Sequence, residues 1–110
     1  MYGAINAFKG DATFYAPGLA ACGKTNKESD LIVAVSHVEY GKHANPNKAP
    51  VCGKCALVKA DGTTKSVKVN VVDSCPGCNS GSVELSPAAF KKLASVDKGR
   101  IQVTWDYVKC

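Results

Sequence analysis

The chain has 110 residues, of which 45% are hydrophobic, and its formal net charge is +5. This length predicts one domain with a packed core, small enough to benefit from covalent cross-links. The sequence has no run of eighteen apolar residues and no leader, so we expect no membrane span and, if the protein is secreted, a signal peptide already removed. Only 7% of the residues are aromatic and the lysines are dispersed, which argues against binding of nucleic acid.

The first half of the chain predicts two strands and one long loop. Residues 9–15 indicate a first strand, and the apolar run 31–36 indicates a strand buried on both faces. Residues 39–50 contain one glycine and two prolines, so we expect an exposed loop there. We expect residues 1–9 to form a loosely ordered N-terminal segment and residues 10–110 to form a single domain.

The strongest structural signal is a β-hairpin. Residues 67–71 alternate valine with polar residues, which is the period-2 pattern of a half-buried strand. An Asp-Gly turn at residues 61–62 precedes this strand, and residues 55–59 provide its antiparallel partner. Val72 breaks the alternation, so both faces of the strand should be covered just before it delivers Asp73.

One helix and two further strands complete the prediction. Residues 83–85 form a short strand, after which Ser86 and Pro87 provide an N-cap and a first helical residue for a helix over residues 88–94. Residues 100–108 alternate strictly and predict a last strand. Six short strands and one helix favour an all-β, small closed barrel.

The six cysteines have two interpretations. The CxxC motifs at residues 52–55 and 75–78 have the spacing of a four-thiolate zinc site. Alternatively, an even number of cysteines fits three disulfides in an oxidising compartment. That interpretation also gives partners to Cys22 and Cys110, the latter anchoring the chain end. The spacing alone leaves both interpretations open.

Four segments, in their order along the chain, resemble double-psi β-barrel proteins. This family includes the first domain of expansins, loosenins, plant barwin and the rare lipoprotein A domain. The resemblance covers residues 10–110 and implies a six-stranded double-psi β-barrel with one short helix, stapled by disulfides. The segments are 10–15 (GDATFY), 21–23 (ACG), 72–78 (VDSCPGC) and 83–90 (VELSPAAF).

The cysteines at residues 52–55 and at the chain end look especially like those of barwin. Barwin's pairing, carried over to this sequence, implies the disulfides Cys22–Cys52 and Cys55–Cys110, with Cys75–Cys78 left as a short bridge. The resemblance therefore implies no zinc, and we expect no other metal and no cofactor.

The resemblance also implies a binding groove that contains Thr13, Tyr15, His37 and Asp73. The aspartate that matches Asp73 is needed for wall loosening in expansins and is a catalytic acid in related hydrolases. A carboxyl group in a partly apolar groove can have a raised pKa and donate a proton. The alternative is that Asp73 accepts backbone hydrogen bonds from the turn at residues 75–78.

Other side chains of the groove have weaker roles. Tyr15 is suited to stack on a sugar ring or a peptide side chain. His37 roughly matches the histidine of lytic rare lipoprotein A domains, although it also fits a cap at a strand end. Phe14 and Trp105 are expected in the core.

Glycoside hydrolysis usually needs a second carboxylate, and none of Asp11, Asp30, Glu84 and Asp106 matches the position of the family's second carboxylate.

Three functions follow from the resemblance. The first is inhibition of papain-like cysteine proteases by a secreted, extracellular, monomeric protein without enzymatic activity, because small single-domain bacterial members resemble such an inhibitor. The contact loops would be residues 16–21, 37–50 and 79–82. The second is loosenin-like binding and loosening of cell-wall polysaccharide without hydrolysis. The third is a lytic enzyme that cleaves glycans through Asp73, with His37 as its second candidate catalytic residue.

Overall fold

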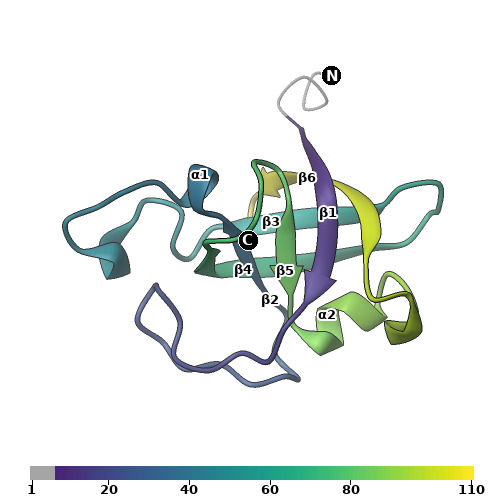
Figure 1. The fold of residues 1–110 in the computed structure, drawn as a ribbon, viewed down its shortest axis with the longest axis horizontal. Helices are drawn as coiled ribbons and strands as arrows, with labels where there is room; N and C mark the ends of the chain where they lie inside the picture. Colours follow the sequence, from purple (N-terminus) through teal and green to yellow (C-terminus); the bar gives the residue numbers. More distant parts are fainter. Residues whose placement is uncertain (1–6) are drawn as a thin grey trace.

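The computed structural model describes residues 7–110, which form a closed six-stranded β-barrel (Figure 1). The prediction of an all-β barrel with six short strands is confirmed. Around the barrel the strands follow the order β1-β5-β2-β4-β3-β6. The strands are β1 (Phe8–Phe14), β2 (Ile32–Ser36), β3 (Cys55–Ala60), β4 (Ser66–Cys75), β5 (Val83–Leu85) and β6 (Ile101–Val108).

The predicted hairpin is formed by β3 and β4. These strands pair antiparallel, with Val58 opposite Val67, around a turn in which Gly62 has a φ of 76°. A positive φ is accessible to glycine at little cost, which explains the Asp-Gly turn. The other contacts of β4 are non-local, because β4 also pairs parallel with β2. A second parallel pair joins β1 to β5.

The core fills the barrel interior with β-branched and aromatic side chains. Alternate valines of β4 point inward as predicted, and Trp105 is 2% exposed, which confirms its place in the core. Phe14 packs against Phe90, with 4.9 Å between the ring centroids. Outside the barrel, a second small cluster contains Ala20, Ile32 and Val72. The largest fully buried side chains include Trp105, Phe90, Leu85, Leu93, Val33, Val35 and Val58.

The expectation of a single helix was wrong. A first short helix, α1 (His37–Tyr40), follows β2 directly, because the Ser36 side chain caps it by accepting the Val38 amide. The predicted loop at residues 39–50 also contains a 3₁₀ turn at Pro46–Lys48.

The helix predicted at residues 88–94 is shorter than expected. Helix α2 (Pro87–Lys91) starts at its expected serine cap and ends three residues early, where both Leu93 and Ala94 donate to the Phe90 carbonyl. A further 3₁₀ turn, Val96–Lys98, leads into β6.

Strand β1 begins before the boundary expected at residue 10. Phe8 pairs with Trp105 and Lys9 with Thr104, and the rings of Phe8 and Trp105 stack with 4.3 Å between their centroids. Aromatic stacking and strand pairing therefore include both residues in the barrel. Residues 1–6 of the predicted N-terminal segment lie outside the described residues.

Three disulfides join Cys22 to Cys52, Cys55 to Cys110 and Cys75 to Cys78. This is the pairing that the resemblance to barwin implies. Because all four cysteines of the two CxxC motifs are used in disulfides, they do not form the four-thiolate site of the zinc interpretation.

Candidate functional site

Four residues on neighbouring strands form a row across the outer face of the barrel. Thr13 is in register with Glu84, Glu84 with Ala34, and Ala34 with Asp73. Paired residues in a sheet point to the same face. Glu84 and Asp73 therefore flank Ala34, with roughly 10 Å between their Cα atoms from two strand spacings. The small Ala34 side chain between the two carboxylates is itself 1% exposed.

A β-bulge turns Asp73 onto this face. Val71 pairs with Val33, whereas the next residue of β2, Ala34, pairs with Asp73, so Val72 is an extra residue in β4. Without the bulge, the alternation of β4 would point Asp73 into the core. Val72 packs on the outside instead, which is why the alternation of the sequence breaks there.

The carboxylate of Asp73 is held by three hydrogen-bond donors. Its Oδ1 accepts the backbone N–H groups of Ala21 and Ser74, each at 2.9 Å, and its Oδ2 accepts the Tyr15 hydroxyl at 3.2 Å. The expected backbone bonds therefore exist, but they do not come from the turn at residues 75–78. Burial, with the Asp73 charge second, raises the pKa of Tyr15, which keeps its hydroxyl protonated as a donor.

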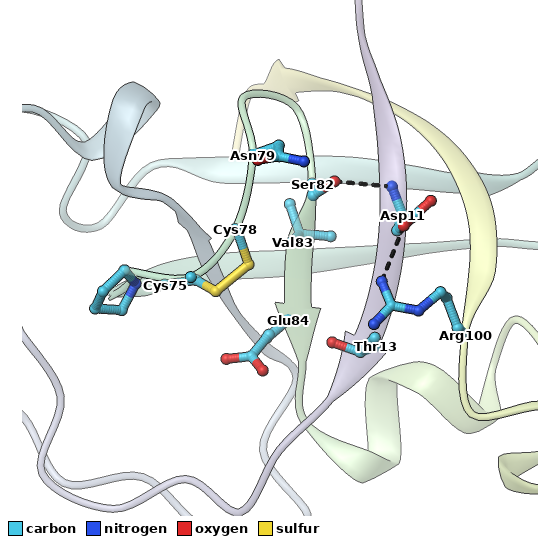
Figure 2. A pocket seen from close by; sticks show the side chains of 11 residues that line it. Asp11, Thr13, Cys75, Cys78, Asn79, Ser82, Val83, Glu84 and Arg100 are labelled. Carbon is cyan, nitrogen blue, oxygen red and sulfur yellow. Dashed lines mark hydrogen bonds and ion pairs between the residues drawn. A yellow bond between two sulfur atoms is a disulfide. The ribbon is translucent and has the colours of Figure 1, made fainter.

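A raised carboxyl pKa occurs at Glu84. Burial raises the pKa of this group above its ordinary value of 4.5, and the negative charge of Asp73 raises it further. Glu84 lines an open pocket of about 320 Å³, where it extends from β5 beside the Cys75–Cys78 disulfide (Figure 2). The lining also includes Asp11, Thr13, Asn79, Ser82 and Arg100.

The far wall of this pocket carries an ion pair. Arg100 donates to Asp11 at 2.9 Å (Figure 2), and Gln102 donates to the other oxygen of the same carboxylate. These two hydrogen bonds, with Gln102 the larger cause, lower the pKa of Asp11. The backbone N–H of Asp11 donates to Ser82 at 3.0 Å. An exposed pair of this kind adds little stability, but it fixes a guanidinium at the pocket rim.

The structure brings together some of the predicted groove residues. Tyr15 and Asp73 are hydrogen-bonded, and Thr13 lies in the row and in the pocket. His37 begins α1 with an exposed side chain, and within residues 7–110 its ring makes no hydrogen bond and does not line this pocket. The structure therefore gives no contact that supports a His37–Asp73 catalytic pair.

Glu84 is the residue that sequence analysis passed over. It was one of four carboxylates with no assigned role, although it lies in the same row as Asp73. Glu84 lies in the segment at residues 83–90 that carried the family resemblance. Its position near Asp73 becomes visible only through the pairing of β5 with β2 and of β2 with β4. No cluster of histidine, cysteine or acidic side chains suited to a metal ion occurs in residues 7–110. Over the same residues, no helix is long and apolar enough to cross a membrane.

Comparison with known families identifies the class of protein. A double-psi β-barrel family described as "Lytic transglycolase" matches residues 7–105. The chain belongs to this family, which the closed six-stranded barrel and the segments noted in the sequence also fit.

Within this family, the chain is similar in sequence to a protease inhibitor and to EG45-like domain proteins. It is 35% identical to "Papain inhibitor" of Streptomyces mobaraensis over 103 residues, which cover 91% of this chain and 71% of that protein. It is 31% identical to an "EG45-like domain containing protein" of Citrus jambhiri over 115 residues, covering 94% of this chain and 83% of the relative.

Solved structures give a similar result. "Streptomyces papain inhibitor" matches with a TM-score of 0.84 at 34% identity, covering 94% of both chains. A mutant Clavibacter michiganensis expansin in complex with cellohexaose matches with a TM-score of 0.77 at 29% identity. That match covers 94% of this chain but only 50% of the expansin.

Proposed function

We propose that this protein is a small, secreted, monomeric inhibitor of papain-like cysteine proteases and has no catalytic activity of its own. The observation that carries the proposal is the match to a papain inhibitor structure over 94% of both chains. The match to the expansin covers only half of that protein.

The physical character of the site supports a binding role. Three donors occupy the carboxylate of Asp73, which suits a structural brace better than a group that must exchange protons with a substrate. Three disulfides fix the loops that surround the barrel. A rigid surface loses little conformational entropy when it docks, which favours tight binding to a protease cleft.

Titration against papain of known active concentration tests the proposal. We expect residual papain activity to fall linearly and to reach its minimum near an equimolar ratio. Trypsin, a serine protease, serves as the control and should keep its activity. Full papain activity in a tenfold molar excess of the folded protein would contradict the proposal.

A second candidate function is binding of cell-wall polysaccharide without hydrolysis. The specific observation in its favour is the row Thr13–Glu84–Ala34–Asp73, of which Thr13 and Glu84 line the open pocket. The similar expansin is in complex with cellohexaose. The hydroxyl groups of a glucan chain can donate hydrogen bonds to carboxylates.

Pull-down on cellulose, chitin and peptidoglycan distinguishes this candidate. Under this second hypothesis, at least one polymer retains the wild type, Glu84→Gln is retained less, and no soluble sugar appears. Release of soluble sugar that is lost in Asp73→Asn would instead establish a lytic enzyme. Absence of retention on all three polymers would exclude the polysaccharide function.

A further inference from the structure

The loop of residues 16–25, which we call the Leu19 loop, carries the most exposed large apolar side chain among the described residues. Leu19 is 78% exposed, and the space around the neighbouring Gly18 is open, with no atom within 4 Å of a Cβ built there. In Figure 1 the loop runs away from the end of β1, below the barrel. Single exposed leucines are common on protein surfaces. Exposure alone therefore does not indicate a binding role for Leu19, and the structure of the loop that carries it must be considered.

The base of the Leu19 loop is a short antiparallel ladder. Leu19 forms a β-bridge with Thr25. The Ala20 amide donates to the Lys24 carbonyl at 2.9 Å, and the Asn26 amide donates to the Gly18 carbonyl at 3.0 Å. Backbone hydrogen bonds on both sides of Leu19 therefore fix the direction in which its side chain projects.

The barrel holds this ladder from behind. The side chain of Ala20 is buried against Ile32 and Val72, and Cys22 is bonded to Cys52. The backbone of Ala21 is fixed on both sides. Its N–H donates to Asp73 at 2.9 Å, and its carbonyl accepts the Asn47 side-chain amide at 2.6 Å. A covalent bond, a small apolar cluster and a carboxylate thus hold Ala20, Ala21 and Cys22, the three residues that follow Leu19.

An exposed apolar side chain on a fixed loop is an arrangement suited to binding. Burying a leucine side chain in a partner contributes favourable hydrophobic free energy, and a preorganised loop loses little of this free energy to ordering. Lys24 and Lys27 lie on the returning arm of the same loop region and are exposed. The complementary surface is an apolar recess bordered by carboxylates.

We propose that the Leu19 loop is the element that enters the protease cleft, with Leu19 as its anchor in an apolar recess and Asp73 as the positioning residue that fixes the loop. This inference rests on the proposed inhibition of a papain-like protease. It assigns Asp73 a role that needs no chemistry at its carboxyl group. The Oδ1 atom is an acceptor for the backbone of the contact loop.

The first test compares inhibition constants against papain. We expect Leu19→Ala to weaken inhibition at least tenfold, because the truncation removes the anchor without disturbing a buried contact. Val96→Ala is the matched control, since Val96 is an apolar residue, 37% exposed, in the 3₁₀ turn beyond α2. Equal inhibition by wild type and Leu19→Ala would overturn the inference while leaving the proposed function intact. Failure of the wild type to inhibit would remove both.

The second test separates positioning from charge at Asp73. An asparagine keeps an Oδ1 acceptor for the Ala21 amide, whereas an alanine does not. We expect Asp73→Ala to weaken inhibition at least tenfold and to speed hydrogen exchange of the Ala21 amide. We expect Asp73→Asn to retain most of the inhibition and most of the slow exchange at Ala21. Equal loss of inhibition in the two variants, with slow exchange at Ala21 retained, would show that the negative charge itself acts and would overturn the positioning role.

Discussion

The carboxylate of Glu39 accepts the backbone N–H of Gly81 at 2.8 Å, across 42 residues of sequence. Its second oxygen accepts the Ser80 hydroxyl at 2.6 Å. On the other side, the carbonyl of Gly81 accepts the Trp105 indole N–H at 2.9 Å. Helix α1 and the core thus hold the loop of residues 79–82 between them. This loop supplies Asn79 and Ser82 to the pocket beside Glu84.

Loss of the Glu39 carboxylate should therefore destabilise the fold. We expect Glu39→Ala to lower the free energy of unfolding by about 2 kcal/mol, because two charge-assisted hydrogen bonds are removed. Urea unfolding followed by Trp105 fluorescence measures this change. Glu28→Ala is the control, since Glu28 is exposed and its side chain makes no hydrogen bond within residues 7–110. Equal midpoints for the two variants would contradict the role of Glu39.

A methyl group at Gly81 should be far more damaging than one at Gly18. A Cβ on Gly81 would lie 2.1 Å from the Lys9 carbonyl oxygen, and its φ is +86°. We expect Gly81→Ala to lose about 4 kcal/mol or more, or to fail to fold, because backbone atoms of β1 must move. Gly18→Ala meets nothing within 4 Å and should unfold with the wild type. Circular dichroism during thermal unfolding compares them, and similar melting temperatures would refute the close packing of β1 on this loop.

Removing the Cys55–Cys110 disulfide should cost more stability than removing Cys75–Cys78. The Cys55–Cys110 bond joins residues with a sequence separation of 55, whereas the Cys75–Cys78 bond joins residues with a sequence separation of 3. The loop-entropy estimate gives about 4 kcal/mol for the long loop and about 2 kcal/mol for the short one. Urea unfolding of the two double Cys→Ala variants measures the difference. The reverse order of stability would be inconsistent with this account.

Reducing agent and chelator should also act differently on the wild type. We expect dithiothreitol to lower the melting temperature and a chelator to leave it unchanged, because the cysteines are joined to each other. Metal analysis should find no stoichiometric zinc in the purified protein, because the thiolates that would bind it are oxidised to disulfides. One zinc per chain, lost together with the fold on chelation, would restore the four-thiolate interpretation.

Glu84 should make stability fall as the pH rises. Its pKa in the folded state is raised above the ordinary 4.5, so the folded protein binds this proton more tightly than the unfolded chain does. The stabilisation is fully present below about pH 4 and is lost as the pH rises through the folded-state pKa. We expect Glu84→Gln to match the wild type at low pH and to be more stable at pH 7. The denaturant midpoints of the two proteins across the pH range measure this effect. A difference in midpoint between Glu84→Gln and the wild type that stayed constant with pH, or that had the opposite sign, would disprove the prediction.

Local patterns explain the parts of the fold that could be predicted from the sequence. The β3–β4 hairpin depends on a turn at residues 61–62 and on alternation within one strand, so neighbouring residues specify it. Helix α1 was missed because its four residues are too few for a periodic pattern. Ser36 and Glu39 do have the spacing of a capping box. The Glu39 side chain nevertheless turns away from the cap to bind Gly81.

The candidate site was harder to predict because its residues meet through non-local pairing. Asp73 and Glu84 become neighbours only because β2 lies between β4 and β5. The outward direction of Asp73 depends on the bulge at Val72, which the sequence showed only as a break in alternation. The burial that raises the pKa of Glu84 likewise results from the assembled barrel.

The Cys22–Cys52 bond has a further effect on residues 41–48, which are exposed and lie between the two cysteines. Exposed loops are the preferred places for proteolytic nicking. A single cut there leaves two polypeptides, one ending in the first part of the loop and the other starting in its second part. Cys22 and Cys52 keep these fragments attached, and the barrel strands on each side remain paired. A molecule cut at this place therefore stays in one covalently linked piece.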